Sequence, residues 1–366
     1  MANFRQMQKE ERETVRPTGS ATDADYLRRA IQLARLGEAT VRRNPLVGAV
    51  LVARERIIGE GYYRQEGGAH AEIQALNRVS ERDRPLLAEA SLYVTLEPCC
   101  IYGRTPPCSS AILAAGIPRV VLSTLDLTPG VAGQSVALLR AAGVEVVTEV
   151  LREAGARLAA PRNVFVSRRR PYVRLKWAQS PDGFLGRPDE RVAISNAYTG
   201  RLTHRWRAAS TAILVGTRTA LLDRPRLDVR HYFGTSPVRV VLDRELRLPA
   251  GSPLLSDGRP TVVVTESTTA PNSAQVRHWT IAFDETLLPS LLARLADEEL
   301  ATLLVEGGAE TLRRFIAAEL WDEALVYTGG RALHGGVRAP TLPVSPVRSV
   351  GIADNRLALY YPPARG

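Results

Sequence analysis

The sequence predicts an α/β protein with two domains, in which helices flank a sheet in each half. Short apolar stretches typical of strands alternate with helical stretches along the chain. A length of 366 residues suits two ordinary domains, and a proline-containing charge run interrupts the pattern near 160–171. We therefore expect a flexible extension over residues 1–20, a first domain over 21–165 and a second over 171–366.

The first half contains four predicted helices and four predicted strands in alternation. In GAHAEIQAL, glycines precede apolar residues at helical spacing, so His70 lies where a helix begins. SLYVTLEPCC indicates a strand ending at Pro98, and CSSAILAAGI indicates a helix that opens with Cys108. The predicted helices are 23–36, 70–80, 108–115 and 133–142, and the predicted strands are 47–53, 91–96, 119–123 and 144–148.

The second half repeats this alternation without an internal repeat or a heptad pattern. Helical stretches such as 198–209 and 309–319 separate its strands. The predicted strands are YVRLKWA, AILVG, RVVLD, TVVVT, TLLVEGG and EALVYT.

A group of metal-ligand residue types stands out in the first half. His70 and Glu72 lie in GGAHAEIQAL, and Cys99 and Cys108 follow; His70 is the only histidine of this half. Zinc with three protein ligands keeps one position open for water and lowers the pKa of that water. A nearby glutamate that is not a ligand can carry protons. The group therefore favours a zinc deaminase, whose pattern is H-x-E followed by P-C-x-x-C.

Other interpretations of these residues stay open. His70 could be a core histidine and the cysteines small buried hydrophobic residues. A structural zinc site needs a fourth ligand, for which Cys100 is the spare candidate, and reactive thiol chemistry is a third alternative. Only three cysteines and no secretory signal argue against a disulfide framework and suit a reducing cytosol.

The loop between the two cysteine ligands departs from the general pattern. Eight residues, CIYGRTPP, separate Cys99 from Cys108 instead of two. We expect these extra residues to line the mouth of the pocket. Arg104 there is a candidate phosphate contact, and a solvated arginine is the alternative.

Composition excludes several classes of protein. Hydrophobic residues make up 45% of the chain, but no apolar run approaches the ~18 residues of a membrane span. The net charge is +10, yet aromatic residues are only 6% and no basic stripe is interleaved with them. We therefore expect anionic small-molecule substrates, and neither nucleic acid nor a membrane as partner.

Two features of the second half suggest a further site. Lys176 is the only lysine besides Lys9 among 48 basic residues, and it lies within a predicted strand. The strand that ends at Glu306 continues with two glycines into helix 309–319, where a backbone can approach a diphosphate. An accidental strand-edge lysine and a plain turn are the alternatives.

These motifs together resemble a riboflavin-biosynthesis family. Its members join a diaminohydroxyphosphoribosylaminopyrimidine deaminase to a 5-amino-6-(5-phosphoribosylamino)uracil reductase. The resemblance covers nearly the whole chain from about residue 22. Its stretches are RRNPLVGAVLV, GGAHAEIQAL, YVTLEPC with GRTPPC, RPYVRLKWAQSPDG, AILVGTRTALLDRPRLDVR and LLVEGGAETL.

The resemblance implies a cytidine-deaminase-like first domain with one Zn²⁺ and a dihydrofolate-reductase-like second domain that uses NADPH. It makes Glu72 the proton shuttle and places Lys176 in the reductase active site. It further implies zinc ligands (His70, Cys99, Cys108), cofactor contacts (Ala178, Thr219, Asp223, Gly308) and substrate contacts (Asn44, Arg207, Leu227, Arg230, Glu306). Arg244, after the strand RVVLD, is a candidate partner for the 2′-phosphate of NADPH.

The expected function is hydrolytic deamination of 2,5-diamino-6-(5-phosphoribosylamino)pyrimidin-4-one, followed by NADPH-dependent reduction of the ribosyl group to ribityl. We expect a cytoplasmic homo-oligomer. The family usually has histidines where Tyr63 and the segment Ile101-Tyr102 stand, and serine in place of Cys100. A paralogue with one working activity or another aminopyrimidine substrate is therefore an alternative, and a nucleic-acid base deaminase is a more distant one.

Overall fold

The computed structural model describes residues 21–103 and 106–363. It divides into two compact units, the first ending at Asn163 and the second beginning at Val164. Among the described residues, no helix is long and apolar enough to cross a membrane.

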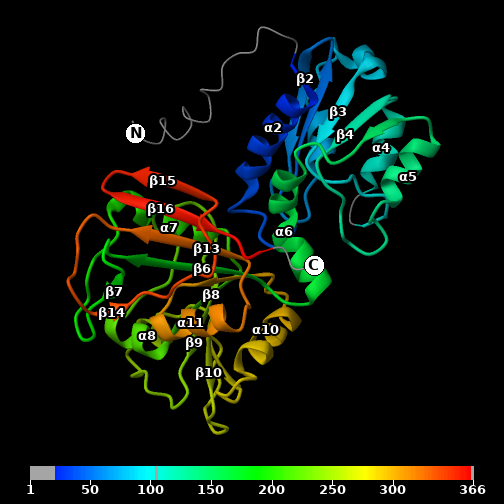
Figure 1. The fold of residues 1–366 in the computed structure, drawn as a ribbon. Coiled ribbons are helices and arrows are strands. Elements are labelled where there is room, and N and C mark those ends of the chain that lie inside the picture. The colour runs from blue at the N-terminus through cyan, green and yellow to red at the C-terminus, as the bar shows by residue number, and fades with distance from the viewer. Residues whose placement is uncertain (1–20, 104–105, 364–366) are drawn as a thin grey trace. The chain divides into compact units, whose positions relative to one another are not determined.

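A five-stranded sheet in the order β2-β1-β3-β4-β5 forms the centre of the first unit (Figure 1). β1 pairs antiparallel with β2 and β3, whereas β3, β4 and β5 run parallel. The strands are β1 Gly48–Ala53, β2 Arg56–Tyr62, β3 Ser91–Val94, β4 Arg119–Leu122 and β5 Glu145–Val147.

Helices cover both faces of this sheet because alternate side chains of a strand point to opposite faces. Val50 and Val52 of β1 belong to the cluster that packs on α2, and Ala49 and Leu51 belong to the cluster formed with α3, α4 and α5. The helices are α2 Asp23–Ala34, α3 Ala71–Leu76, α4 Cys108–Ala114, α5 Gln134–Ala141 and α6 Arg152–Arg168, with short 3₁₀ turns at Arg35–Gly37 and Arg84–Glu89.

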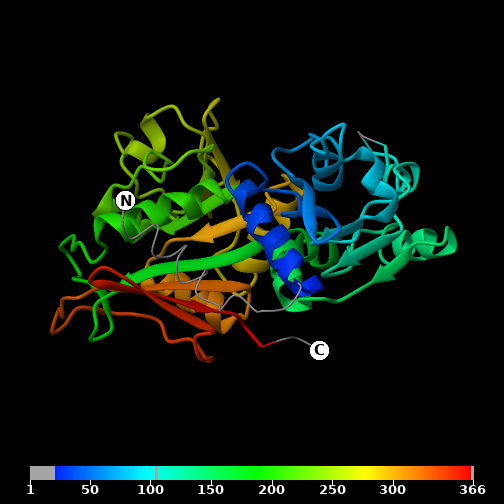
Figure 2. The same cartoon turned by 90° about the horizontal axis from the view of Figure 1, so that it is seen from above.

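Helix α6 crosses the boundary between the units. It continues through Pro161, where the sequence suggested a break. Leu158 of α6 packs with Ile31 and Ala34 of α2, the dark-blue helix in Figure 2. This packing offsets the hydrogen bond that the proline removes.

The second unit is built on a nine-stranded sheet in the order β11-β10-β9-β8-β12-β6-β13-β16-β15, with a separate β7/β14 pair. All strands from β11 to β13 run parallel, and β16 and β15 add an antiparallel edge. The strands are β6 Tyr172–Gln179, β7 Phe184–Gly186, β8 Ala212–Gly216, β9 Val238–Leu242, β10 Thr261–Thr265, β11 Val276–Thr280, β12 Thr302–Val305, β13 Glu323–Thr328, β14 Val337–Arg338, β15 Arg348–Ile352 and β16 Asn355–Tyr360.

Helices also cover both faces of the second sheet. α10 and α11 pack on one face through leucines and Phe315, and α7 and α8 pack on the other through residues such as Trp206 and Ala220. The carboxyl ends of β6, β8 and β12 therefore meet at one edge of the sheet, where ligands of open α/β sheets bind. The helices are α7 Ala197–Ala208, α8 Thr217–Asp223, α9 Pro253–Ser256, α10 Leu287–Asp297 and α11 Ala309–Ala317.

Candidate active sites

The three predicted metal ligands meet in the first unit. His70 is the residue before α3, Cys108 is the first residue of α4, and Cys99 lies on the loop after β3. Nδ1 of His70 lies 3.2 Å from Sγ of Cys108 and 3.5 Å from Sγ of Cys99. The three ligand atoms lie within 4.8 Å of one another. One imidazole and two thiols at such spacing fit a zinc ion with one position left for another ligand.

A glycine on β2 lets α3 approach the sheet closely enough to bring His70 to this point. A Cβ on Gly61 would lie 2.2 Å from the carbonyl oxygen of Ala71 and 2.4 Å from the amide nitrogen of Ala75. Any larger residue there would push the start of α3 outward. Gly61 of β2 therefore helps to set the position of His70.

Glu72 is buried beside the ligand cluster and is only 3% exposed. Burial raises the pKa of Glu72 to about 7, and the nearby His70 opposes this rise. A carboxyl group with a pKa near neutrality both accepts and donates a proton readily. Hydrogen bonds from Cys108 and then His70 lower the pKa of Cys99, because they stabilise its thiolate.

Glu97, which the sequence analysis did not single out, anchors the loop that carries Cys99. Its buried carboxylate accepts hydrogen bonds from four backbone N–H groups, at 3.3 Å from Asp126, 2.9 Å from Gly133, 3.1 Å from Ser135 and 3.2 Å from Val136. The last two belong to the first turn of α5, so the carboxylate caps this helix. In the sequence, the position of this acidic residue directly before Pro98-Cys99 could have indicated such a supporting role.

Tyr63 packs against His70, one of the three candidate metal ligands. Its ring meets the His70 ring edge-on, with centroids 5.5 Å apart, and its hydroxyl accepts hydrogen bonds from Nδ2 of Asn44 at 3.2 Å and the amide of Gly67 at 2.8 Å. Asn44 is thus linked to the candidate ligand His70 through Tyr63. In the loop between Cys99 and Cys108, Tyr102 is 81% exposed. Arg104 lies outside the described residues.

The second site is a cavity of about 1190 Å³ at the carboxyl ends of β6, β8 and β12. A volume of this order accommodates a dinucleotide cofactor together with a small substrate. It brings together nine of the residues expected to serve the reductase: Lys176, Ala178, Arg207, Thr219, Asp223, Leu227, Arg230, Glu306 and Gly308. Arg244 is not among its lining residues. Instead, Nε of Arg244 pairs with Glu266 at 2.7 Å on the surface, so its contact with the cofactor stays a prediction.

Glycines bring the ends of β8 and β12 into contact at the floor of this cavity. The amide of Gly216 donates a hydrogen bond to the carbonyl of Gly307 at 3.0 Å. A Cβ on Gly308 would lie 2.9 Å from Oγ1 of Thr219, so only glycine leaves the threonine in place. Gly308 immediately precedes α11, whose N-terminal amides favour an anion such as a cofactor phosphate.

A buried ion pair lies at the centre of the cavity lining. Nε and Nη2 of Arg207 bind the two carboxylate oxygens of Glu306 at 2.7 and 2.8 Å. Burial alone would raise the pKa of Glu306, but Arg207 and then Lys176 lower it to about 2.

Lys176 lies on β6 with Nζ 5.5 Å from the centre of the Tyr327 ring, and burial lowers its pKa. Asp223, in contrast, has its pKa raised by burial. Glu306 therefore stays charged at neutral pH, whereas burial disfavours the charged forms of Lys176 and Asp223.

Family comparisons divide the chain in the same way. Residues 20–124 match the cytidine and deoxycytidylate deaminase zinc-binding region, and residues 171–349 match the RibD C-terminal domain. The riboflavin biosynthesis protein RibD of Aquifex aeolicus is 36% identical over 320 residues, which covers 86% of this chain and 89% of that protein. RibD of Bacillus amyloliquefaciens is 37% identical over 326 residues and covers 87% of this chain and 86% of its own length.

Solved structures of related proteins are similar to this chain over both of its units. A diaminohydroxyphosphoribosylaminopyrimidine deaminase/5-amino-6-(5-phosphoribosylamino)uracil reductase from Thermotoga maritima is 32% identical, with a TM-score of 0.83 over 93% of this chain and 98% of that chain. RibD of Acinetobacter baumannii is 30% identical, with a TM-score of 0.80 over 93% and 99% of the two chains. The chain therefore belongs to the RibD family of riboflavin biosynthesis, with a zinc-binding, cytidine-deaminase-like domain followed by an NADPH-dependent, dihydrofolate-reductase-like domain.

Proposed function

We propose that His70, Cys99 and Cys108 hold the zinc ion of the deaminase and that Glu72 moves protons at the same site. The support is the short spacing of the three ligand atoms, together with a buried carboxyl that is not one of them. A bound zinc ion supplies a Lewis acid that makes water nucleophilic near neutral pH. Glu72 accepts a proton from this water and delivers it to the amino group, which leaves as ammonia. The second proton of the water passes to the adjacent ring nitrogen as the ring carbon becomes a carbonyl.

The substrate we propose is 2,5-diamino-6-(5-phosphoribosylamino)pyrimidin-4-one, whose deaminated product passes to the reductase. The name of the Thermotoga maritima relative supports this choice. The arginines that line the second cavity support a phosphorylated substrate, because guanidinium groups bind phosphate through paired donors. The homo-oligomeric state and the cytoplasmic location expected from the sequence stay predictions.

In the reductase, this chain orients the opened ribosyl group of the deaminated product. NADPH supplies the hydride that reaches C1′, and the nitrogen on C1′ takes up the balancing proton, for which we propose Nζ of Lys176 as donor. Glu306, held ionised by Arg207, accepts hydrogen bonds from sugar hydroxyls. We assign Ala178, Thr219, Asp223 and Gly308 to the cofactor, and Leu227 and Arg230 to the substrate.

One assay tests both halves of this function. The purified zinc-loaded chain is given the diaminopyrimidine precursor and NADPH, and ammonia release and NADPH absorbance are followed separately. We expect one ammonia and one NADPH oxidised per precursor consumed. NADPH oxidation with pre-deaminated substrate, but no ammonia from the precursor, would indicate a paralogue whose deaminase pocket accepts another substrate.

A further inference from the structure

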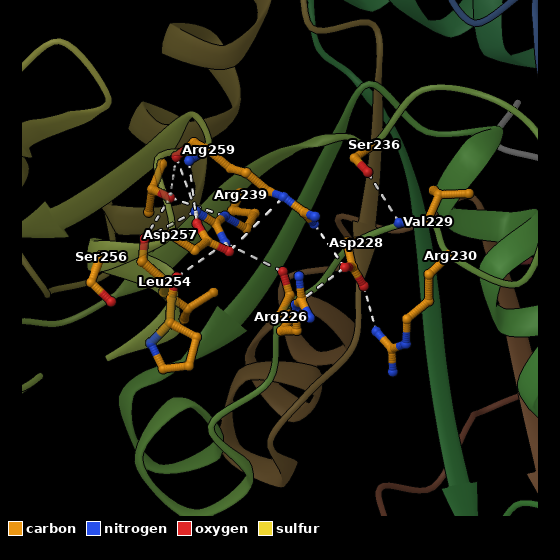
Figure 3. Close-up of polar contacts among 12 residues, drawn as sticks. Arg226, Asp228, Val229, Arg230, Ser236, Arg239, Leu254, Ser256, Asp257 and Arg259 are labelled. Atoms are coloured by element: carbon orange, nitrogen blue, oxygen red, sulfur yellow. Dashed lines mark hydrogen bonds and ion pairs between the residues drawn. The ribbon is translucent and has the colours of Figure 1, made fainter. Parts of the chain in front are cut away.

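A buried aspartate stands behind the arginines of the reductase cavity. Asp228 is 2% exposed and lies in RPRLDVR, the loop that follows α8. Its carboxylate pairs with three guanidinium groups: Nε of Arg226 at 3.4 Å, Nη1 of Arg259 at 2.8 Å and Nη1 of Arg230 (Figure 3). One carboxylate thus lies within ion-pair distance of three guanidinium groups.

Two of these three arginines face the cavity. Arg226 and Arg230 are lining residues with side chains 57% and 48% exposed, whereas Asp228 and Arg259 are not in the lining. The free faces of both lining guanidinium groups are therefore open to a ligand. Three arginines around a single carboxylate leave a local excess of two positive charges, which matches a phosphate monoester dianion.

The arrangement is anchored in the sheet. Arg239 of β9 is 2% exposed, and it binds Asp257 through Nη2 at 2.7 Å and through Nη1 at 2.9 Å. It also donates to the carbonyl of Arg259 at 2.9 Å and to that of Arg226 at 3.3 Å (Figure 3). The backbone of two residues that pair with Asp228, Arg226 and Arg259, is thereby hydrogen-bonded to a strand of the core. Buried donors with fixed acceptors leave little freedom for the loop to move.

Asp228 is also joined to the helix that carries the buried ion pair. Its carbonyl accepts a hydrogen bond from Nη1 of Arg207 at 3.1 Å, and the amide of Arg230 lies 3.3 Å from Nδ1 of His204 on α7. Burial opposes ionisation of Asp228, but the hydrogen bonds from Arg259 and Arg230 lower its pKa to about 2, so the carboxylate stays charged at neutral pH.

We infer that Asp228 is a positioning residue for substrate phosphate: it holds Arg226 and Arg230 so that their free faces bind the phosphate monoester of the ribosyl group. This inference rests on the proposed reductase function. A phosphate could also come from NADPH, and the test below separates the two sources. Without the carboxylate, three like charges repel one another and the two lining guanidinium groups lose their common orientation.

The test compares wild-type protein with Asp228→Asn and with Asp297→Asn, an exposed aspartate of α10 that serves as the matched control. Reductase kinetics are measured on pre-deaminated substrate with and without its phosphate. For Asp228→Asn we expect a rise in KM of about 10- to 100-fold for the phosphorylated substrate, the loss typical of charge-assisted hydrogen bonds. Its kcat, its KM for NADPH and its kinetics on the dephosphorylated substrate should match those of the control.

Each other outcome has a definite meaning. An equal loss on both substrates would show a general structural role, and a change confined to the KM for NADPH would assign the arginines to the cofactor; either result overturns the inference. Should Asp228→Asn fail to fold, Asp228→Glu keeps the charge but shifts the guanidinium groups. It should then give a smaller loss, again restricted to the phosphorylated substrate.

Failure of the proposed function is distinguishable from failure of this inference. If the wild-type protein oxidises no NADPH with either substrate, the proposed reduction is wrong. Binding of inorganic phosphate, measured by calorimetry on wild-type and Asp228→Asn protein, then decides the positioning role. Weaker binding by the variant supports it, and equal binding contradicts it.

Discussion

Replacing Glu72 by glutamine should stop ammonia release and leave NADPH oxidation intact. Glutamine preserves the size of the side chain but cannot carry a proton between water and the leaving amino group. General acid–base groups contribute about 10²- to 10⁴-fold to a rate, so we expect kcat for deamination to fall by a factor in this range. Ammonia is measured with the diaminopyrimidine precursor, and NADPH oxidation with pre-deaminated substrate.

Glu81→Gln provides the matched control for this variant. Glu81 lies a few residues after α3 with its side chain 86% exposed, and it pairs with Arg84 at the surface. This variant should deaminate at the wild-type rate. Retained deamination by Glu72→Gln, at a normal zinc content, would contradict the role assigned to Glu72.

Removing one partner of the Arg207–Glu306 pair should destabilise the second unit severely. The side chains are 11% and 9% exposed, so Arg207→Met leaves a buried carboxylate without its partner. Breaking such a pair typically costs about 3–5 kcal/mol. All four tryptophans lie after Val164, at positions 177, 206, 279 and 321, so their fluorescence reports denaturant unfolding of the second unit alone.

A double variant separates stability from function at this pair. Arg207→Met with Glu306→Leu removes both charges, and replacing a buried ion pair by apolar residues is often neutral for stability. We expect the double variant to regain most of the lost free energy of unfolding and to remain inactive as a reductase. Wild-type stability of Arg207→Met, or reduction by the double variant, would contradict the account of this pair.

The central strands and the clustering of His70, Cys99 and Cys108 could be predicted from the sequence because their signals are local. Apolar runs of strand length predicted β1, β3, β4 and β5 of the first sheet and β6, β8, β9, β10, β12 and β13 of the second, but not the parallel strand β11. The pattern H-x-E with P-C predicted the cluster around His70. The α/β class with a cytidine-deaminase-like and a dihydrofolate-reductase-like domain is confirmed by the family comparisons.

The strand β2 was missed because its turn lacks the usual residues. Arg54 and Glu55 connect β1 to β2 with φ values of 51° and 59°, a conformation that Asn-Gly or Asp-Gly usually signals. The sequence RERIIGEGYY therefore gives no hairpin signal. Pairing with β1 along its length stabilises the hairpin in spite of this turn.

The supporting residues of both sites were missed for a different reason. Glu97 accepts hydrogen bonds from, and Asp228 forms ion pairs with, groups far apart in the sequence, such as Val136 and Arg259. No single-sequence spacing encodes such contacts, since they depend on how the loops close. The ion pair between Arg207 and Glu306, whose partners are 99 positions apart in the sequence, was missed for the same reason.

X-ray absorption at the zinc edge tests the central claim most directly. The account predicts one zinc per chain, with two sulfur ligands at about 2.3 Å, one imidazole nitrogen and one further light atom from solvent. Cys108→Ser should lose one sulfur from this shell, whereas Cys100→Ser, which alters the neighbouring thiol, should leave it unchanged. A third sulfur, a fourth ligand from the protein, or a chain without zinc would contradict a catalytic metal held by His70, Cys99 and Cys108.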